Sequence, residues 1–152
     1  PSSEGLGYEK KEKGVSLLEL ERGYGDDLEV KQVLIVGVGG FLGAVLRYAV
    51  TACCSSERFA VGTLAVNALG CLVIGAVVGW VELRGELEAQ TRALLVVGVL
   101  GSFTTFSAFG NEVMELMREG RNLAAGGVVL AHLALGFGAV VVGRALSLYA
   151  LR

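Results

Sequence analysis

Residues 93–111 read ALLVVGVLGSFTTFSAFGN, and this uncharged run lies between Arg92 and Glu112. As a helix rising ~1.5 Å per residue, its 19 residues reach across most of the ~30 Å hydrocarbon core of a bilayer. Residues 98–105, at its centre, are rich in glycine, serine and threonine, which weaken or bend a helix. The sequence therefore predicts a membrane-spanning helix that is broken near its middle.

Three further apolar runs predict the remaining spans of the protein. They cover residues 33–54, 59–81 and 122–143, and Arg47 in the first is their only charged side chain. Each run has 22 or 23 residues, which is enough to cross a bilayer as a helix. The connectors are short, so consecutive spans are expected to be antiparallel neighbours. We predict an all-α integral membrane protein with four transmembrane helices and a break in the third.

Composition sets the class of protein and its domains. Apolar residues make up 53% of the chain, and the net charge of −2 offers no basic surface to nucleic acid. Residues 1–31 carry eight acids and five bases, without an apolar run that could span a bilayer or serve as a secretory signal. We expect residues 1–31 to be a soluble N-terminal extension of unknown role, and residues 32–152 to be the transmembrane domain.

Two features bear on whether a second subunit is needed. Lys and Arg near the span ends number five on one side and four on the other, which is no decisive bias under the positive-inside rule. Such a count fits weakly specified topology and equally an antiparallel dimer that uses both orientations. Small-residue faces at Gly39/Gly43 and Gly75/Gly79 allow close helix packing, either between subunits or within one.

Three polar side chains interrupt the predicted spans, and each has two possible interpretations. Arg47 is either an anchor that reaches the headgroups or a group that faces an anion. Asn67 requires a partner at membrane depth, which is either a neighbouring helix or a bound anion. His132, the only histidine, is either a hydrogen-bonded packing residue or a proton relay.

The predicted break is itself a candidate ion site. Backbone carbonyls freed on the turn between Gly101 and Thr104 suit a small cation, because a break at membrane depth must satisfy its backbone groups. Phe106 and Phe109 follow at a spacing that places both rings on one helix face. Their ring edges carry partial positive charge, so the pair either packs or lines a path for a small anion.

Three motifs together resemble the fluoride channels of the Fluc (CrcB) family. They are GGFLGAVLRY at residues 39–48, GTLAVNALG at 62–70 and GSFTTFSAF at 101–109. The resemblance covers roughly residues 32–150. It implies an antiparallel, dual-topology homodimer in the cell membrane that exports cytoplasmic fluoride passively and confers fluoride resistance.

The resemblance also implies roles for individual residues. Backbone carbonyls of Gly101 and Thr104 would hold a structural Na⁺ at the dimer interface. The fluoride pathway would be formed by Asn67, Phe106 and Phe109, with Thr105, Ser107 and Arg47 along it. No enzymatic step is implied.

Two departures from the family pattern and two alternatives remain at this stage. Ala108 stands where the third motif usually has threonine, and the fourth span offers only His132 as an interior polar group. A small dual-topology multidrug exporter is disfavoured because the first span lacks a carboxylate. A structural membrane subunit would explain the glycine faces without requiring a broken span.

Overall fold

A computed structural model describes residues 17–54 and 61–151 of the chain, and every regular element within them is helical. The elements are α1 (Leu17–Cys54), α2 (Val61–Arg84), α3 (Ala89–Arg92), η1 (Ala93–Leu100), α4 (Gly101–Phe103), α5 (Phe106–Arg118) and α6 (Asn122–Ala150). The chain divides into two compact units, residues 1–31 and 32–152. All contacts described below lie within the second unit.

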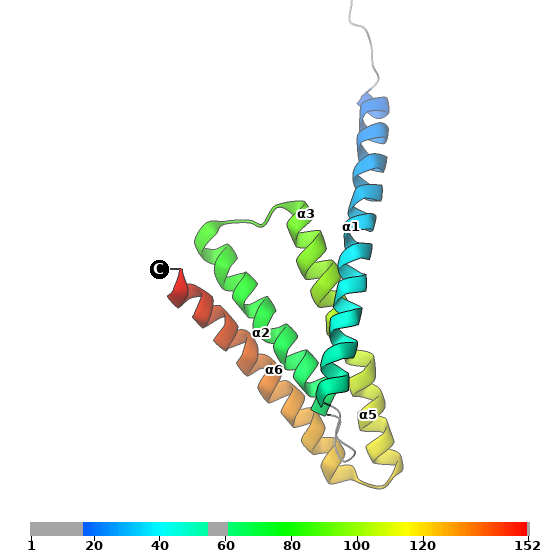
Figure 1. Ribbon diagram of the computed structural model, residues 1–152, viewed down its shortest axis with the longest axis vertical. Coiled ribbons are helices and arrows are strands. Elements are labelled where there is room, and N and C mark those ends of the chain that lie inside the picture. The colour runs from blue at the N-terminus through cyan, green and yellow to red at the C-terminus, as the bar shows by residue number, and fades with distance from the viewer. Residues whose placement is uncertain (1–16, 55–60, 152) are drawn as a thin grey trace, which may run out of the picture. The chain divides into compact units, whose positions relative to one another are not determined.

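Four helical segments are long and apolar enough to cross a membrane: Val30–Cys54, Val61–Arg84, Ala89–Arg118 and Asn122–Ala150 (Figure 1). The prediction of four spans, with a break in the third, is confirmed. The third segment extends beyond the predicted residues 93–111 at both ends. Its last turns are amphipathic, so Glu112 and Glu115 belong to a helix that a search for uncharged runs ends too early.

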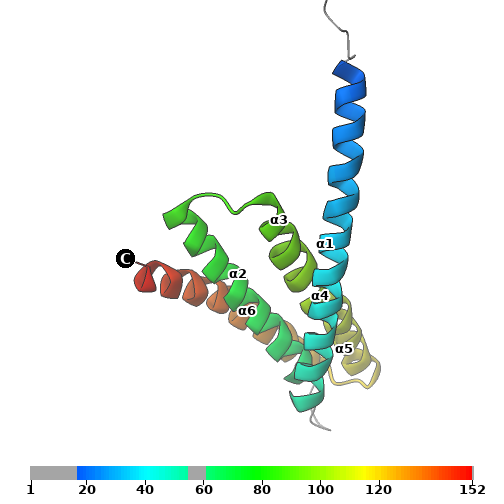
Figure 2. The same ribbon diagram turned by 45° about the horizontal axis from the view of Figure 1, so that its top comes forward.

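Helices α2 and α6 lie side by side along most of their length (Figures 1 and 2). A Cβ built on Gly75 or on Gly143 would collide with backbone atoms of Val140 or Leu72. A Cβ on Gly79 would lie 2.7 Å from the carbonyl oxygen of Arg144. Backbone therefore contacts backbone along this pair, and the second glycine face packs within the subunit.

The first glycine face also packs within the subunit, against the third span. A Cβ on Gly39 would lie 2.5 Å from the carbonyl oxygen of Leu94 and 3.0 Å from the Cα of Gly98. One turn on, a Cβ on Gly43 would collide with the backbone of Val99. These contacts involve η1, a π-helical stretch that is unusual in length and is separated from the break only by the short helix α4.

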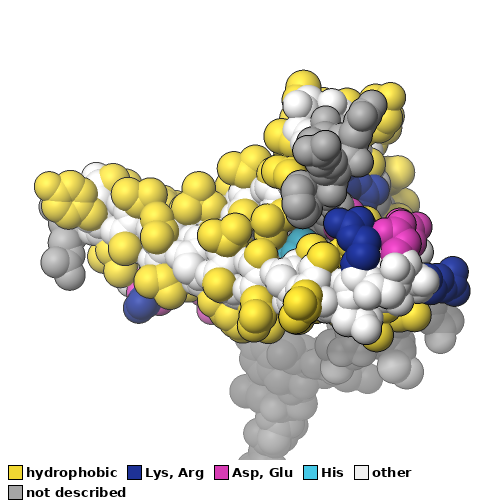
Figure 3. Space-filling model, turned by 90° about the horizontal axis from the view of Figure 1, so that it is seen from below, with side chains coloured by type: hydrophobic (Ala, Val, Ile, Leu, Met, Phe, Trp, Pro, Cys, Tyr) yellow, Lys and Arg dark blue, Asp and Glu magenta, His cyan; other side chains and the backbone are white. Residues whose placement is uncertain are grey.

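Apolar side chains cover much of the surface of the described residues. Figure 3 shows hydrophobic groups over much of the visible face, with basic and acidic groups gathered in two separate places. Large apolar residues such as Leu123, Leu130 and Phe137 are highly exposed. This pattern suits a solvent of lipid tails, so the chain is a multi-pass membrane protein.

Candidate functional site

The third span breaks at Thr104 and Thr105, which join α4 to α5 through extended backbone. Thr104 has φ −78° and ψ 155°, and Thr105 has φ −149° and ψ 110°. The N–H and the hydroxyl of Thr104 both donate to the carbonyl oxygen of Leu100, at 3.1 and 3.0 Å. The helix before the break is thus closed by Thr104, and the backbone of Thr105 needs partners elsewhere.

Asn67 on α2 supplies both of those partners. Its Oδ1 accepts from the N–H of Thr105 at 2.8 Å, and its Nδ2 donates to the carbonyl oxygen of Thr105 at 3.1 Å. The primary amide therefore matches the two backbone groups of one residue in the break. Because an amide nitrogen carries two hydrogens, one Nδ2 hydrogen remains for another acceptor.

Thr105 also caps the helix that follows the break. Its Oγ1 accepts from the N–H of Ala108 at 3.2 Å and lies 3.3 Å from the Oγ of Ser107. A threonine at this position satisfies one of the free amides at a helix start. The positive end of the helix dipole of α5 consequently lies beside the Asn67 amide, and this favours a negative ion there.

Aromatic rings continue the site along α5. The ring centroids of Phe106 and Phe109 lie 5.5 Å apart, with planes inclined by 57°. Phe106 is 82% exposed within the subunit, whereas the ring of Phe109 packs on the imidazole of His132 from α6 at 4.3 Å. Phe106 therefore presents an aromatic ring to whatever surrounds the subunit.

Sequence reasoning missed one pair of residues in this region. The hydroxyl of Thr63 on α2 donates to Oε1 of Glu112 on α5, and Oε2 of Glu112 is buried without a hydrogen-bond partner among the described residues. Thr63 precedes Asn67 by four residues and Glu112 follows Phe109 by three, so helical spacing places each on a face already singled out. That spacing is a usable signal, although the charge of Glu112 puts it outside the uncharged run.

The predicted cation ligands fit the chemistry of a small hard cation. In a continuous helix the carbonyl of Gly101 would accept from the N–H of Thr105, and that of Thr104 from the N–H of Ala108. Both amides have other acceptors here, namely Asn67 and the Thr105 hydroxyl. Two carbonyl oxygens near the break have thus lost their usual donors, and hard cations prefer oxygen ligands.

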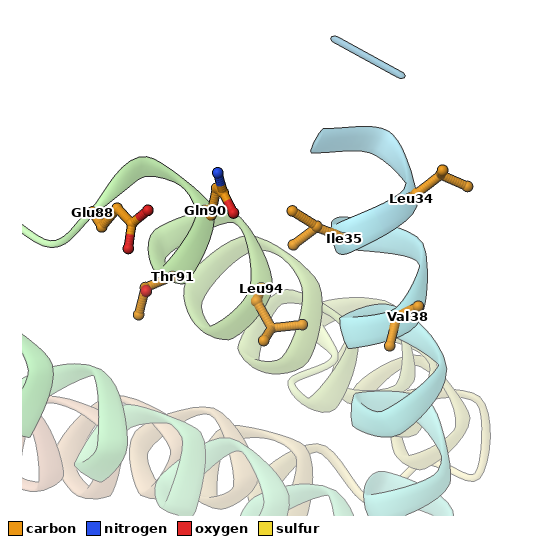
Figure 4. A pocket seen from close by; sticks show the side chains of 7 residues that line it. All are labelled: Leu34, Ile35, Val38, Glu88, Gln90, Thr91 and Leu94. Carbon is orange, nitrogen blue, oxygen red and sulfur yellow. The ribbon is translucent and has the colours of Figure 1, made fainter. Parts of the chain in front are cut away.

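Other features lie outside this cluster. Arg47 on α1 is half-buried and forms no hydrogen bond or ion pair within residues 17–54 and 61–151. An open groove involves different residues altogether, from α1 and from the start of the third span (Figure 4). It is lined by Leu34, Ile35, Val38, Glu88, Gln90, Thr91 and Leu94. The structure therefore brings Asn67, Thr105, Ser107 and the Phe pair together but does not join Arg47 to them.

Comparison with known proteins points to one group. Residues 34–144 match the family model described as CrcB-like protein, Camphor Resistance (CrcB). The chain is 41% identical over 117 residues to a fluoride-specific ion channel FluC of Rhizobium leguminosarum, which covers 75% of this chain and 94% of that protein. It is 38% identical over 121 residues to the FluC of Oceanobacillus iheyensis, covering 79% and 94%. It is 35% identical over 118 residues to FluC 3 of Methanosarcina barkeri, covering 76% and 89%.

Proposed function

Because this chain belongs to the CrcB-like protein family, we propose that it is a fluoride-selective channel through which fluoride leaves the cell passively. The observation that carries the proposal is the Asn67 amide clamped on the Thr105 backbone. Beside this clamp lie the start of α5 and the pair of Phe106 and Phe109. Together these groups offer N–H donors, a positive helix end and ring edges to an anion of small radius.

Selectivity for fluoride follows from replacing its tightly held water. A spare Nδ2 hydrogen of Asn67 and the ring edges of the Phe pair provide fixed partial positive charge in place of hydration, as dipoles do in other filters. The Thr105 and Ser107 hydroxyls, which lie within 3.3 Å of each other, add rotatable donors on the same stretch. The driving force is the electrochemical gradient, since hydrogen fluoride enters as a neutral acid and dissociates in a less acidic cytoplasm. The activity is transport and includes no catalytic step.

The proposed working unit is an antiparallel homodimer in the cell membrane with one structural Na⁺ at its centre. A bundle of four spans has little interior for an ion path, and the near-equal Lys and Arg counts on the two sides favour use of both orientations. Gly101 and Thr104 would hold the ion, because two subunits together offer four carbonyl oxygens whose usual donors bind elsewhere. When bound there, the Na⁺ would supply electrostatic cohesion between the subunits.

Fluoride efflux from proteoliposomes tests this function. Purified protein is reconstituted into vesicles loaded with potassium fluoride, and loss of fluoride is followed with a fluoride electrode after the potassium gradient is released with an ionophore. Matched vesicles loaded with chloride provide the control. Rapid loss of fluoride with retention of chloride is expected. Retention of both ions by vesicles that contain folded dimers would contradict the channel and return attention to a structural subunit or a drug exporter.

A further inference from the structure

His132 lies at the aromatic end of the site, in the first half of α6. Its imidazole packs on the ring of Phe109, with centroids 4.3 Å apart and planes inclined by 43°. Phe109 in turn contacts Phe106. The three rings form one continuous row, which here is called the ring row (Phe106, Phe109 and His132). An ion that passes the Phe pair therefore passes within reach of a titratable ring.

The hydrogen bond of His132 decides which ring nitrogen carries the proton. Nδ1 lies 3.0 Å from the carbonyl oxygen of Val128, and a carbonyl oxygen only accepts. Nδ1 is therefore the N–H of the neutral ring, which leaves a lone pair on Nε2. This Nε2 is buried and has no hydrogen-bond partner within the part of the chain that the structure describes. A buried polar atom without a partner is costly and commonly marks a place where something else binds.

The two protonation states of His132 have opposite effects on an anion. The neutral ring presents a lone pair at Nε2, which repels fluoride. The protonated ring presents an N–H and a full positive charge, which together give a charge-assisted hydrogen bond to fluoride. A proton and a fluoride ion therefore stabilise one another at this position.

Titratable groups on the neighbouring helices shape the same site. Glu112 on α5 lies one turn beyond Phe109, with Oε1 bound by Thr63 and a buried, unpartnered Oε2. Cys71 on α2 has its Sγ 3.7 Å from a Cβ built on Gly136, one turn beyond His132. Arg144, on α6 itself, lies about three turns away and is paired with Glu82 of α2.

We propose that His132 is a proton-linked fluoride contact: fluoride at the ring row accepts a hydrogen bond from Nε2–H of the protonated imidazole. The proton comes from solvent and binds at the Nε2 lone pair, and this reversible N–H bond is the only bond that forms within the protein. This inference rests on the proposed function, since it concerns the same ion path. It goes further by making passage of fluoride depend on pH through one residue of α6.

Efflux measured against pH is the first test. Fluoride loss from proteoliposomes is followed from pH ~5.5 to ~8, the range in which imidazole titrates, and the leak of neutral hydrogen fluoride from protein-free vesicles is subtracted. Wild-type efflux is expected to rise by at least ~5-fold toward low pH, the lower end of typical coupling between two ligands. His132→Phe keeps a ring on Phe109 and His132→Gln keeps an N–H donor, yet neither titrates. Both are expected to give flat profiles.

The outcomes separate this inference from the proposed function. A pH profile in His132→Phe that matches the wild type would overturn the role of His132 and leave the channel intact. Absence of wild-type fluoride efflux at every pH would overturn both. Chloride-loaded vesicles show whether any pH effect is specific to fluoride.

Direct titration of the imidazole is the second test and needs no variant. His132 is the only histidine of the chain, so its ring proton resonance is assigned without ambiguity in detergent-solubilised protein. With potassium fluoride added, the midpoint of its chemical-shift titration is expected to move to higher pH by about 0.7 unit, which corresponds to a coupling of ~5-fold. Potassium chloride at equal ionic strength is the control. An unchanged midpoint in fluoride would overturn the proposal.

Discussion

Helix α2 has two faces that are closed in different ways. The face toward α6 is closed by backbone contact at Gly75 and Gly79. The face toward the third span is closed by two polar side chains: Asn67 binds both backbone groups of Thr105 in the break, and Thr63 binds Glu112 on α5. The first seam, α2–α6, needs only small residues at the right spacing. The second seam, between α2 and the break, needs hydrogen-bond donors and acceptors at defined positions. The polar groups proposed to contact fluoride therefore lie at this seam.

The largest expected effect comes from filling the first seam. In Gly143→Leu the new Cβ meets the carbonyl oxygen of Leu72, which belongs to backbone and cannot rotate away. We expect the free energy of unfolding to fall by ~3 kcal/mol or more, which is at the upper end of the cost of overpacking a core, so that little protein folds. Thermal stability is measured by size-exclusion chromatography of detergent extracts heated in steps.

The matched control for this change lies on the same helix. Gly138 has no atom within 4 Å of a Cβ built on it, so Gly138→Leu adds the same side chain in open space. This variant is expected to give the same yield of folded protein in detergent and the same melting temperature as the wild type. Equal melting of Gly143→Leu and Gly138→Leu would show that the α2–α6 seam does not depend on close backbone contact.

The next effect comes from the second seam, through Asn67→Asp. The aspartate still accepts from the N–H of Thr105, but its other oxygen faces the carbonyl oxygen of Thr105, where Nδ2 donated before. The unpaired acceptors and the new negative charge are expected to raise the free energy of fluoride in the pathway by ~1–3 kcal/mol. Fluoride efflux should therefore fall by ~5- to 150-fold. Asn122→Asp adds the same charge at the exposed start of α6 and should leave efflux unchanged. Equal efflux from the two variants would remove Asn67 from the path.

How far the sequence predicts each seam follows from the kind of contact. The small-residue spacing Gly75/Gly79 is visible in the sequence because close packing depends on side-chain size alone. The four spans are visible for the same reason, since length and hydropathy suffice to predict them. The predicted third span is shorter than the observed segment. Its last part is missed because that part is an amphipathic helix rather than an apolar run.

The polar seam was predicted only in part. Asn67 and the break were each singled out, but nothing in the sequence specifies that both backbone groups of Thr105 bind one amide. The link between Thr63 and Glu112 joins residues 49 positions apart and depends on how α2 and α5 meet. Pairings of this kind are set by tertiary packing, so a single sequence supplies the candidate residues without their partners.

A smaller effect is expected at the aromatic side of the second seam. Phe106→Ile removes the ring edge but little packing, because Phe106 is 82% exposed within the subunit. If the lost interaction with fluoride is worth ~0.5–1.5 kcal/mol, the range for aromatic pairs, fluoride efflux should fall by ~2- to 12-fold. Thermal stability should not change. Phe137→Ile makes the same change at a ring on α6 that is 71% exposed and belongs to no ring contact within the described residues. If both variants conduct alike, Phe106 does not line the path.

The smallest effect should come from the ion pair between Arg144 of α6 and Glu82 of α2. Arg144 donates to both carboxylate oxygens of Glu82, at 2.8 and 2.9 Å, but both side chains are substantially exposed, so solvent competes for the interaction. Glu82→Gln keeps one acceptor for the guanidinium and removes the charge. Because backbone contact at the glycines already closes this seam, we expect unchanged fluoride efflux and a melting temperature close to that of Gly138→Leu. A drop in stability comparable to that of Gly143→Leu would mean that the ion pair, rather than the glycine contact, holds α2 against α6. The α2–α6 seam would then depend on specific polar atoms, as the seam between α2 and the break does, and the contrast between the two would fail.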